Sequence, residues 1–328
     1  MRIRLPLVMI GGALLVVGCT DSTTGPVPAT PSVTQIQQPA PGIFKTRQAV
    51  AAEWTGDPMA ARGGGGGKGG NTGIFYHGGP VIFQTRVAAI YWGTSAIYNG
   101  GPTPGTTGTG AQDGSLIGFF LRNLGGSSYF NINTTYFDGT NTHVQNSVTY
   151  TQFWADNSAP AATVSDAALQ AEVASALSSG KLTYDPSTLY HVFTGPGINL
   201  GGGFGSSYCA YHGHFTWNGN DVKYSAMPYD NTFPSACTAL NGSPNNDVAA
   251  DAEVNTLAHE TEETTTDEDL NAWFDRRGNE NADKCAWMFG TTYTTANGST
   301  ANVKIGGKDF LVQMNWINTG SGGCRQGL

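Results

Sequence analysis

The stretch Leu257-Ala258-His259-Glu260-Thr261-Glu262-Glu263 contains the pattern His-Glu-x-x-Glu, and the rest of the chain is interpreted from it. Residues four positions apart lie on one face of an α-helix, so a helix here directs His259 and Glu263 the same way with Glu260 beside them. Zinc proteins with an H-E-x-x-H helix arrange two ligands and a general base in this manner. The stretch therefore predicts half of a zinc site, with Glu263 in place of the second histidine.

The ends of this helix are also visible in the sequence. Asp247 or Asp251 can cap its start, and the β-branched run 264–266 disfavours its continuation. Six of the eight glutamates of the chain lie between Glu253 and Glu280, so the alternative is a solvated acidic helix without a metal. The apolar pair Leu257 and Ala258 favours a helix that is at least partly buried.

A second acidic segment, Gly278 to Cys285, supplies candidates for a third ligand. Either Asp283 or Glu280 would complete the site, and the other carboxylate would orient His259 from outside the ligand shell. Glu260 would deprotonate a water molecule. One imidazole with two carboxylates binds zinc, but selects it less sharply against manganese or calcium than two imidazoles do.

Composition and patterning indicate an exported α+β protein. The chain has 328 residues, of which only 12% are charged, and its net charge of −8 argues against nucleic acid as a partner. We expect a single zincin-like domain with a mixed sheet, the motif-bearing helix and a C-terminal β-hairpin. The expected strands are 81–92, 147–153, 189–194, 214–217, 222–227, 303–305 and 310–316, and two further helices are expected over 115–124 and 165–179.

The N-terminus has the features of a targeting segment. Arg2 and Arg4 precede an apolar run, 5–18, that is shorter than the ~20 residues of a membrane-spanning helix and ends directly before Cys19. This ending is typical of bacterial lipoproteins, and the alternative is an ordinary signal peptide. We therefore predict a lipoprotein signal peptide over 1–18, a flexible tether over 19–72 and the folded domain over 73–328, with a lipid on Cys19 anchoring the protein to a membrane.

The four remaining cysteines suggest two disulfides in an oxidising compartment. Three connectivities are open, and we favour Cys209–Cys237 and Cys285–Cys324 because each pair encloses one compact region. Most of the other histidines are expected to be structural. His212 and His214, which lie beside Cys209 and a predicted hairpin, are candidates to line the cleft and to stabilise a developing oxyanion.

Three ordered motifs resemble the EXORDIUM or phosphate-induced protein 1 family. They are His259-Glu260-x-x-Glu263, the run 270–274 (Leu-Asn-Ala-Trp-Phe), and Glu280-x-Ala282-Asp283-x-Cys285. Plant members carry His-Glu-Leu-Ala-Glu, Asn-Ala-Trp-Tyr and Glu-Ile-Ala-Asp-Leu-Cys in the same order. The resemblance spans about 74–324 and implies an extracellular protein, linked in plants to cell expansion, without an established enzyme activity. The polar Glu262, where plant members have Ala, is expected to leave this helix face less buried.

Two functions follow as expectations. The first is a surface-anchored extracytoplasmic protein with a His/Glu/Asp zinc site that acts as a metal-dependent peptidase or related hydrolase on a peptide or cell-wall polymer. The second is a non-catalytic binding module of the cell envelope, in which the ion or the acidic cluster braces the fold. In both cases the expected location is the bacterial cell envelope, at the outer membrane or the cell surface.

Overall fold

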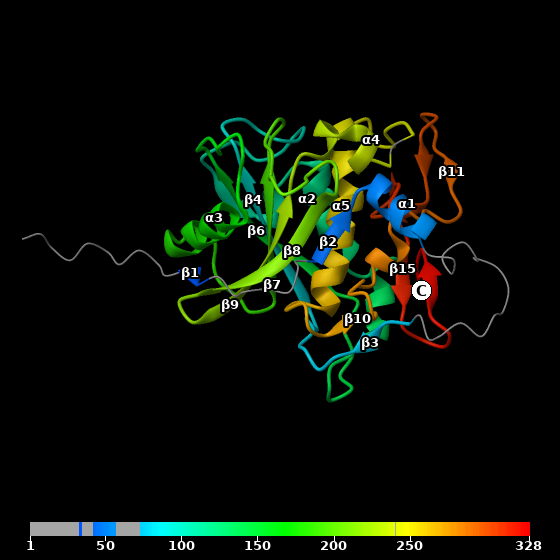
Figure 1. Cartoon of the computed structure of the whole chain (residues 1–328). Coiled ribbons are helices and arrows are strands. Elements are labelled where there is room, and N and C mark those ends of the chain that lie inside the picture. Colours follow the sequence, from blue (N-terminus) through cyan, green and yellow to red (C-terminus); the bar gives the residue numbers. More distant parts are fainter. Residues whose placement is uncertain (1–32, 35–41, 57–72, 240) are drawn as a thin grey trace, which may run out of the picture. The chain divides into compact units, whose positions relative to one another are not determined.

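The computed structural model describes residues 33–34, 42–56, 73–239 and 241–328 (Figure 1). The predicted signal peptide, the lipidation site Cys19 and most of the predicted tether lie outside these residues. Within the described part of the chain, no helix is both long and apolar enough to cross a membrane.

An eight-stranded mixed sheet forms the centre of the fold. Its order is β1-β8-β9-β7-β4-β6-β5, and β2 also pairs with β8. The strands are β1 (Val33–Thr34), β2 (Gly42–Lys45), β4 (Thr85–Trp92), β5 (Thr107–Thr109), β6 (Val148–Asp156), β7 (Thr188–Thr194), β8 (Tyr208–Trp217) and β9 (Asn220–Met227). The four inner strands β9, β7, β4 and β6 are parallel, whereas β8, β5, β1 and β2 are antiparallel to their neighbours. The buried β4 is rich in β-branched and aromatic residues and lies between β7 and β6, and it begins at Thr85, four residues after the start of the expected strand 81–92.

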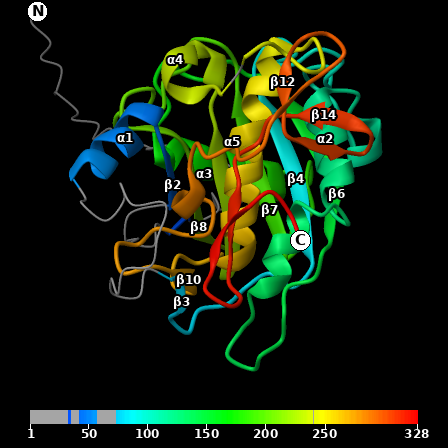
Figure 2. The same ribbon diagram turned by 90° about the vertical axis from the view of Figure 1, so that its right-hand side faces the viewer.

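Helices cover both faces of the sheet (Figures 1 and 2). The helices are α1 (Arg47–Gly56), α2 (Leu116–Leu124), α3 (Asp166–Ser178), α4 (Pro234–Cys237) and α5 (Val248–Thr266). One apolar core packs α3 against one face, and a second core packs α2 and α5 against the other. Helices α2 and α3 form where the sequence predicts them, over 115–124 and 165–179, and Ser115 and Ser165 cap their first turns. The prediction of an α+β fold with a mixed sheet and a motif-bearing helix is confirmed.

Short strands and 3₁₀ turns make up much of the remainder. The additional strands are β3 (Phe75–Tyr76), β10 (Trp273–Phe274), β11 (Tyr293–Thr294), β12 (Thr300–Ala301), β13 (Val303–Ile305), β14 (Lys308–Phe310), β15 (Asn315–Ile317) and β16 (Gly323–Arg325). The 3₁₀ turns are η1 (Gly110–Gln112), η2 (Phe130–Thr135), η3 (Asp230–Thr232) and η4 (Asp283–Cys285). The predicted hairpins form, with Asn218-Gly219 between β8 and β9 and Gly306-Gly307 between β13 and β14. All four of these turn residues have positive φ, which suits tight hairpin turns.

The tether prediction is wrong for residues 42–56, which form β2 and α1. Strand β2 pairs with β8, with Gly42 opposite His212. Phe44 is fully buried and stacks between two rings, 4.2 Å from the His259 ring and 4.7 Å from that of Trp287. The pairing with β8 and the burial of Phe44 therefore hold a short strand whose surrounding composition is that of a linker.

Both predicted disulfides are present. Cys209–Cys237 joins β8 to α4, and Cys285–Cys324 joins η4 to the C-terminal strand β16. Each bond lies close to a segment of the site described next: Cys209 is three residues before His212, and Cys285 is two residues after Asp283.

Candidate metal centre

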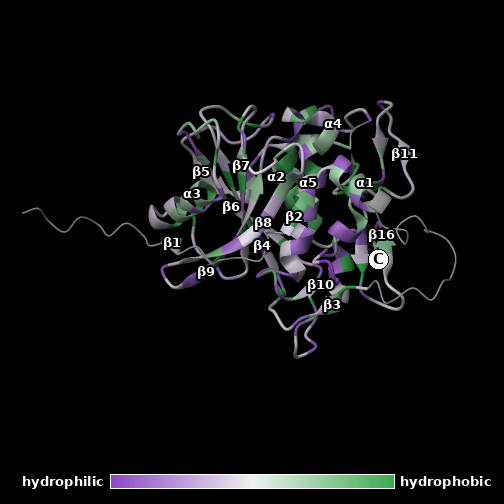
Figure 3. Ribbon diagram, viewed as in Figure 1, coloured by the Kyte–Doolittle hydropathy of each residue, from purple (hydrophilic) through white to green (hydrophobic). Residues whose placement is uncertain are grey.

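Helix α5 runs through the protein interior. Every residue from Ala250 to Thr266 is buried, although the helix carries hydrophilic as well as hydrophobic residues along its length (Figure 3). It packs against β2, β8, β9, α2 and η2, which together surround it. Asp247 caps its first turn by accepting a hydrogen bond from the Ala250 amide, and the helix ends within the predicted threonine run. The alternative of a solvated acidic helix is therefore wrong.

The sequence-predicted ligands His259, Glu263 and Asp283 form one triad. His259 Nε2 lies 3.1 Å from Glu263 Oε1 and 3.7 Å from Asp283 Oδ1. The backbone amide of Asp283 donates to Glu263 Oε1 at 2.8 Å, which ties η4 to the helix. On the other side of the ring, His259 Nδ1 lies 3.0 Å from the side-chain nitrogen of Gln313. The two predicted segments thus meet, and Asp283 rather than Glu280 is the carboxylate next to His259.

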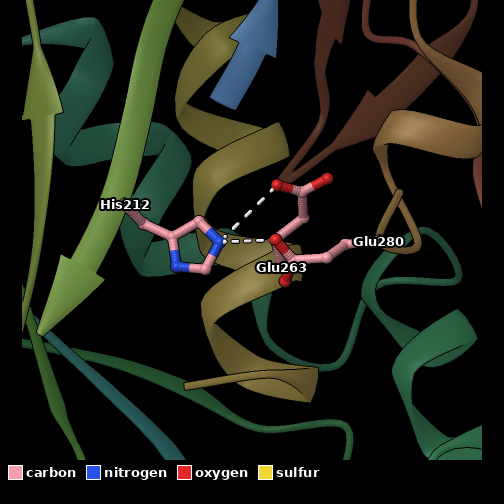
Figure 4. Close-up of side chains that lie close together, drawn as sticks. All are labelled: His212, Glu263 and Glu280. Atoms are coloured by element: carbon pink, nitrogen blue, oxygen red, sulfur yellow. Dashed lines mark hydrogen bonds and ion pairs between the residues drawn. The ribbon is translucent and has the colours of Figure 1, made fainter. Parts of the chain in front are cut away.

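Glu280 belongs to a second triad, formed with His212 and again with Glu263 (Figure 4). His212 Nε2 lies 3.1 Å from Glu280 Oε2 and 3.6 Å from Glu263 Oε2. In each triad, one ligand atom from each residue lies within 4.8 Å of the other two. Sequence reasoning placed His212 beside the cleft but did not assign it as a ligand. The available signal was its place in an apolar strand, where a buried imidazole requires a polar partner.

The five residues of the two triads shift one another's pKa values. Burial raises the pKa of Glu263, but His259 and His212 outweigh this effect and hold it at about 2. Burial lowers the pKa of His259, yet the Glu263 carboxylate raises it to about 9. Burial together with the charge of Glu263 raises the pKa of Asp283 to about 7, and burial raises that of Glu280 well above its usual range. Perturbed groups gathered in this way are typical of functional sites, although structural ion pairs also produce them.

Several polar atoms of the cluster have no hydrogen-bond partner among the described residues. They are His212 Nδ1, His259 Nε2, Glu263 Oε2, Glu280 Oε1 and both carboxylate oxygens of Glu260. Burial raises the pKa of Glu260 to about 8, and its charge interacts with His259, His212, Glu263 and Asp283. Native proteins rarely leave so many buried polar atoms unpaired, so the donor set fits a bound cation with or without water.

Glu262 is buried as completely as its neighbours, which corrects the prediction of a less buried helix face. It lies near Tyr129 and Tyr136, whose pKa values it raises through its charge in addition to the larger effect of their burial. Neither of its carboxylate oxygens has a hydrogen-bond partner among the described residues, and burial raises its own pKa well above the usual range. Glu262 is absent from both triads.

A cleft of about 280 Å³ reaches the cluster from outside. Glu280 and Asp283 are part of its wall, and Gly42 contributes backbone where a side chain would collide with His212. The cations Lys45 and Arg277 also line the cleft. Its volume is slightly below the range of about 300–1,000 Å³ that is usual for small-molecule pockets, so it suits a single side chain or a small polar group.

The second cleft histidine of the sequence prediction, His214, lies in a separate and partly exposed cluster. Its Nδ1 atom is 2.8 Å from Asp221 Oδ1 and 3.6 Å from Asp269 Oδ1. Lys223 Nζ lies 2.9 Å from Asp221 Oδ2 and supplies a positive charge to this cluster. His214 is therefore part of an ion-pair network at the β8–β9 end and not of the triads.

One family model matches the chain, that of the phosphate-induced protein 1 conserved region, over residues 125–313. The matched part contains both triads together with Gln313. No curated protein and no solved structure matches the chain significantly. The family match covers more than half of the 328 residues and agrees with the three sequence motifs. The chain therefore belongs to the EXORDIUM or phosphate-induced protein 1 family.

Proposed function

We propose that the protein is a zinc-dependent hydrolase of the bacterial cell envelope, anchored by a lipid on Cys19 and zincin-like in its use of α5. The zinc ligands in this proposal are His259, Glu263 and Asp283. The observation that carries it is the position of His259 Nε2, which lies 3.1 Å from Glu263 Oε1 and 3.7 Å from Asp283 Oδ1 without a hydrogen-bond partner. Zinc with ligands at about 2.0–2.1 Å in tetrahedral geometry separates neighbouring ligand atoms by about 3.3 Å, close to both values.

A bound zinc ion would supply Lewis acidity at the end of the cleft. Glu260 would act as the general base, because one of its oxygens can take a proton from water and return it to the leaving group. Lys45 and Arg277, which line the cleft, would attract an anionic group such as a carboxylate of a peptide or a cell-wall fragment.

The test uses the full chain, stripped of metal and titrated with zinc in detergent. We expect one or more equivalents to bind, and peptides or cell-wall fragments to be hydrolysed only by the loaded protein. Glu260→Gln should retain zinc and lose at least 100-fold in rate, because a general base contributes about 10²–10⁴-fold. Hydrolysis that survives this substitution contradicts the role of Glu260, and failure to bind zinc contradicts the proposal.

The second candidate is a non-catalytic binding module whose buried cluster braces the fold, and one contact favours it. The side-chain nitrogen of Gln313 donates to the Ala282 carbonyl at 2.8 Å and also faces His259 Nδ1. With the Gln313 amide in this orientation, Nδ1 of a neutral His259 ring accepts a hydrogen bond from the amide nitrogen. The ring proton then lies on Nε2, which faces Glu263. A zinc ion at Nε2 requires the proton on Nδ1 and a reversed Gln313 amide. If the protein is such a module, it should take up no zinc, and His259→Ala should lower its melting temperature by a large amount.

A further inference from the structure

Glu263 connects the two triads through different oxygen atoms. Its Oε1 faces His259 Nε2 at 3.1 Å, and its Oε2 faces His212 Nε2 at 3.6 Å. The two histidines come from α5 and β8, and both side chains are completely buried. A carboxylate placed between two such groups can bridge two cations as well as bind one.

We propose that the site holds two divalent cations bridged by Glu263, which rests on the proposed function for the first cation. The first ion is bound by His259 and Asp283, and the second by His212 and Glu280. The second triad is visible in Figure 4, where the His212 ring points at the two carboxylates. All the residues of both triads therefore come from this one chain.

The distances in the second triad have the size that metal ligation requires. His212 Nε2 is 3.1 Å from Glu280 Oε2 and 3.6 Å from Glu263 Oε2. Ligand atoms of a tetrahedral ion with bonds of about 2.0–2.1 Å lie about 3.3 Å apart. A bridging carboxylate holds the ions of two-metal sites about 3.5–4 Å apart.

The unpaired atoms of the second triad are an independent observation. Glu280 is only 3% exposed, and its Oε1 atom has no hydrogen-bond partner among the described residues. The same holds for Oε2 of the fully buried Glu263. Glu263 Oε2 faces the second triad, 3.6 Å from His212 Nε2, and a site for the first ion alone leaves both of these oxygens without a partner.

A two-ion centre narrows the substrate class. Two adjacent cations suit a substrate with an oxygen that gains negative charge, such as a carbonyl or phosphoryl group next to the bond that breaks. The wall residues Glu280 and Asp283 place one carboxylate of each ion site at the cleft. The group that binds there would therefore contact both ion sites from the same side.

The experiment counts ions in the full chain, purified in detergent, stripped and then equilibrated with manganese. We expect two equivalents in the wild type and a spin-coupled pair in the electron paramagnetic resonance spectrum. His212→Asn and Glu280→Gln should each retain one equivalent and give an uncoupled manganese signal. His77→Gln, at an exposed position, is the matched control and should retain two.

The outcomes separate this inference from the proposed function. One equivalent in the wild type overturns the second ion and leaves the first in place. No binding of manganese overturns the two-cation centre, and the zinc titration then decides the proposed function separately. If the wild type, His212→Asn and Glu280→Gln all bind two equivalents, the assignment of the second triad is overturned. Circular dichroism checks that the variants fold, and the isosteric Glu280→Gln keeps the test valid if His212→Asn is unstable.

Discussion

His212 and Glu280 are 68 residues apart in the sequence, yet His212 Nε2 lies 3.1 Å from Glu280 Oε2 in the protein interior. One side chain comes from a strand of the central sheet, and the other comes from the segment that precedes η4. Glu263 of α5 lies beside this pair, with its Oε2 atom 3.6 Å from His212 Nε2, so three separate parts of the chain converge. Perturbing any one of these parts should change cation binding in a predictable way.

Gly42→Ala should disturb the cluster from the side of β2. A Cβ atom at this position would lie 2.0 Å from His212 Nε2 and 2.6 Å from Glu280 Oε2, which is closer than side-chain atoms approach. Either β2 or the His212 ring must move, so we expect at least a tenfold loss of cation affinity, measured by calorimetry. Gly195→Ala is the control because its Cβ would meet nothing within 4 Å. Equal affinities in both variants would contradict the close approach of β2 to the site.

The disulfide Cys285–Cys324 should matter more for cation affinity than Cys209–Cys237. It holds η4, a 3₁₀ turn with Asp283 at its start, whereas Cys209 lies in β8, which is already paired on both sides. Replacing both cysteines of a pair by alanine should cost up to about 4 kcal/mol of stability in either case, from loop-closure entropy. Only loss of Cys285–Cys324 should also weaken cation binding, by about tenfold. Similar affinities in the two double variants would show that η4 is held by other contacts.

The sequence revealed the parts of the site that are local along the chain. His259 and Glu263 share a helix face because they are four residues apart, and the cap at Asp247 is equally local. The second segment was found through its motif, but the pairing of Asp283 with His259 and of Glu280 with His212 depends on how η4 packs. No periodicity carries that information.

The parts that His212 and Gly42 play in the site depend on contacts between residues far apart in the sequence. Both depend on the register of β2, β8 and β9, which hydrogen bonding between distant strands determines. The linker-like composition around Gly42 also hid a strand that is held by its pairing with β8 and by the buried ring of Phe44. The burial of Glu262 was missed for a related reason, since a charged residue is almost never fully buried unless it is paired.

Glu262→Gln should stabilise the protein relative to the wild type, increasingly so as the pH rises above about 4.3. Burial raises the pKa of Glu262 in the folded state, so the folded protein keeps a proton that the unfolded chain releases above about pH 4.3. The free energy of unfolding therefore falls as the pH rises from there toward the folded pKa. Glutamine does not titrate, and the difference between variant and wild type should grow between pH 5 and pH 8 in chemical denaturation. Glu53→Gln, at an exposed position, is the control. A difference that does not change with pH would mean that Glu262 is ionised in the fold.

His191, which lies next to α5, should have the opposite effect on stability, which should fall as the pH decreases. It is fully buried in β7, where Nδ1 lies 2.7 Å from the Ser225 hydroxyl and Nε2 lies 3.4 Å from the Thr261 hydroxyl. Burial lowers its pKa to about 3, so the folded protein keeps this imidazole neutral in mild acid.

As the pH falls from 6.5 toward 3, the unfolded chain takes up a proton at His191 that the folded protein does not accept. The free energy of unfolding should therefore decrease by up to about 1.4 kcal/mol per pH unit through this residue alone. In His191→Gln that contribution is absent, so the variant should lose less stability than the wild type between pH 6.5 and pH 4. Urea denaturation across this pH range measures the difference in stability between variant and wild type. His77→Gln controls for the loss of one histidine from the chain. Parallel profiles for wild type and His191→Gln would mean that the ring is protonated inside the fold, beside Ser225 and Thr261.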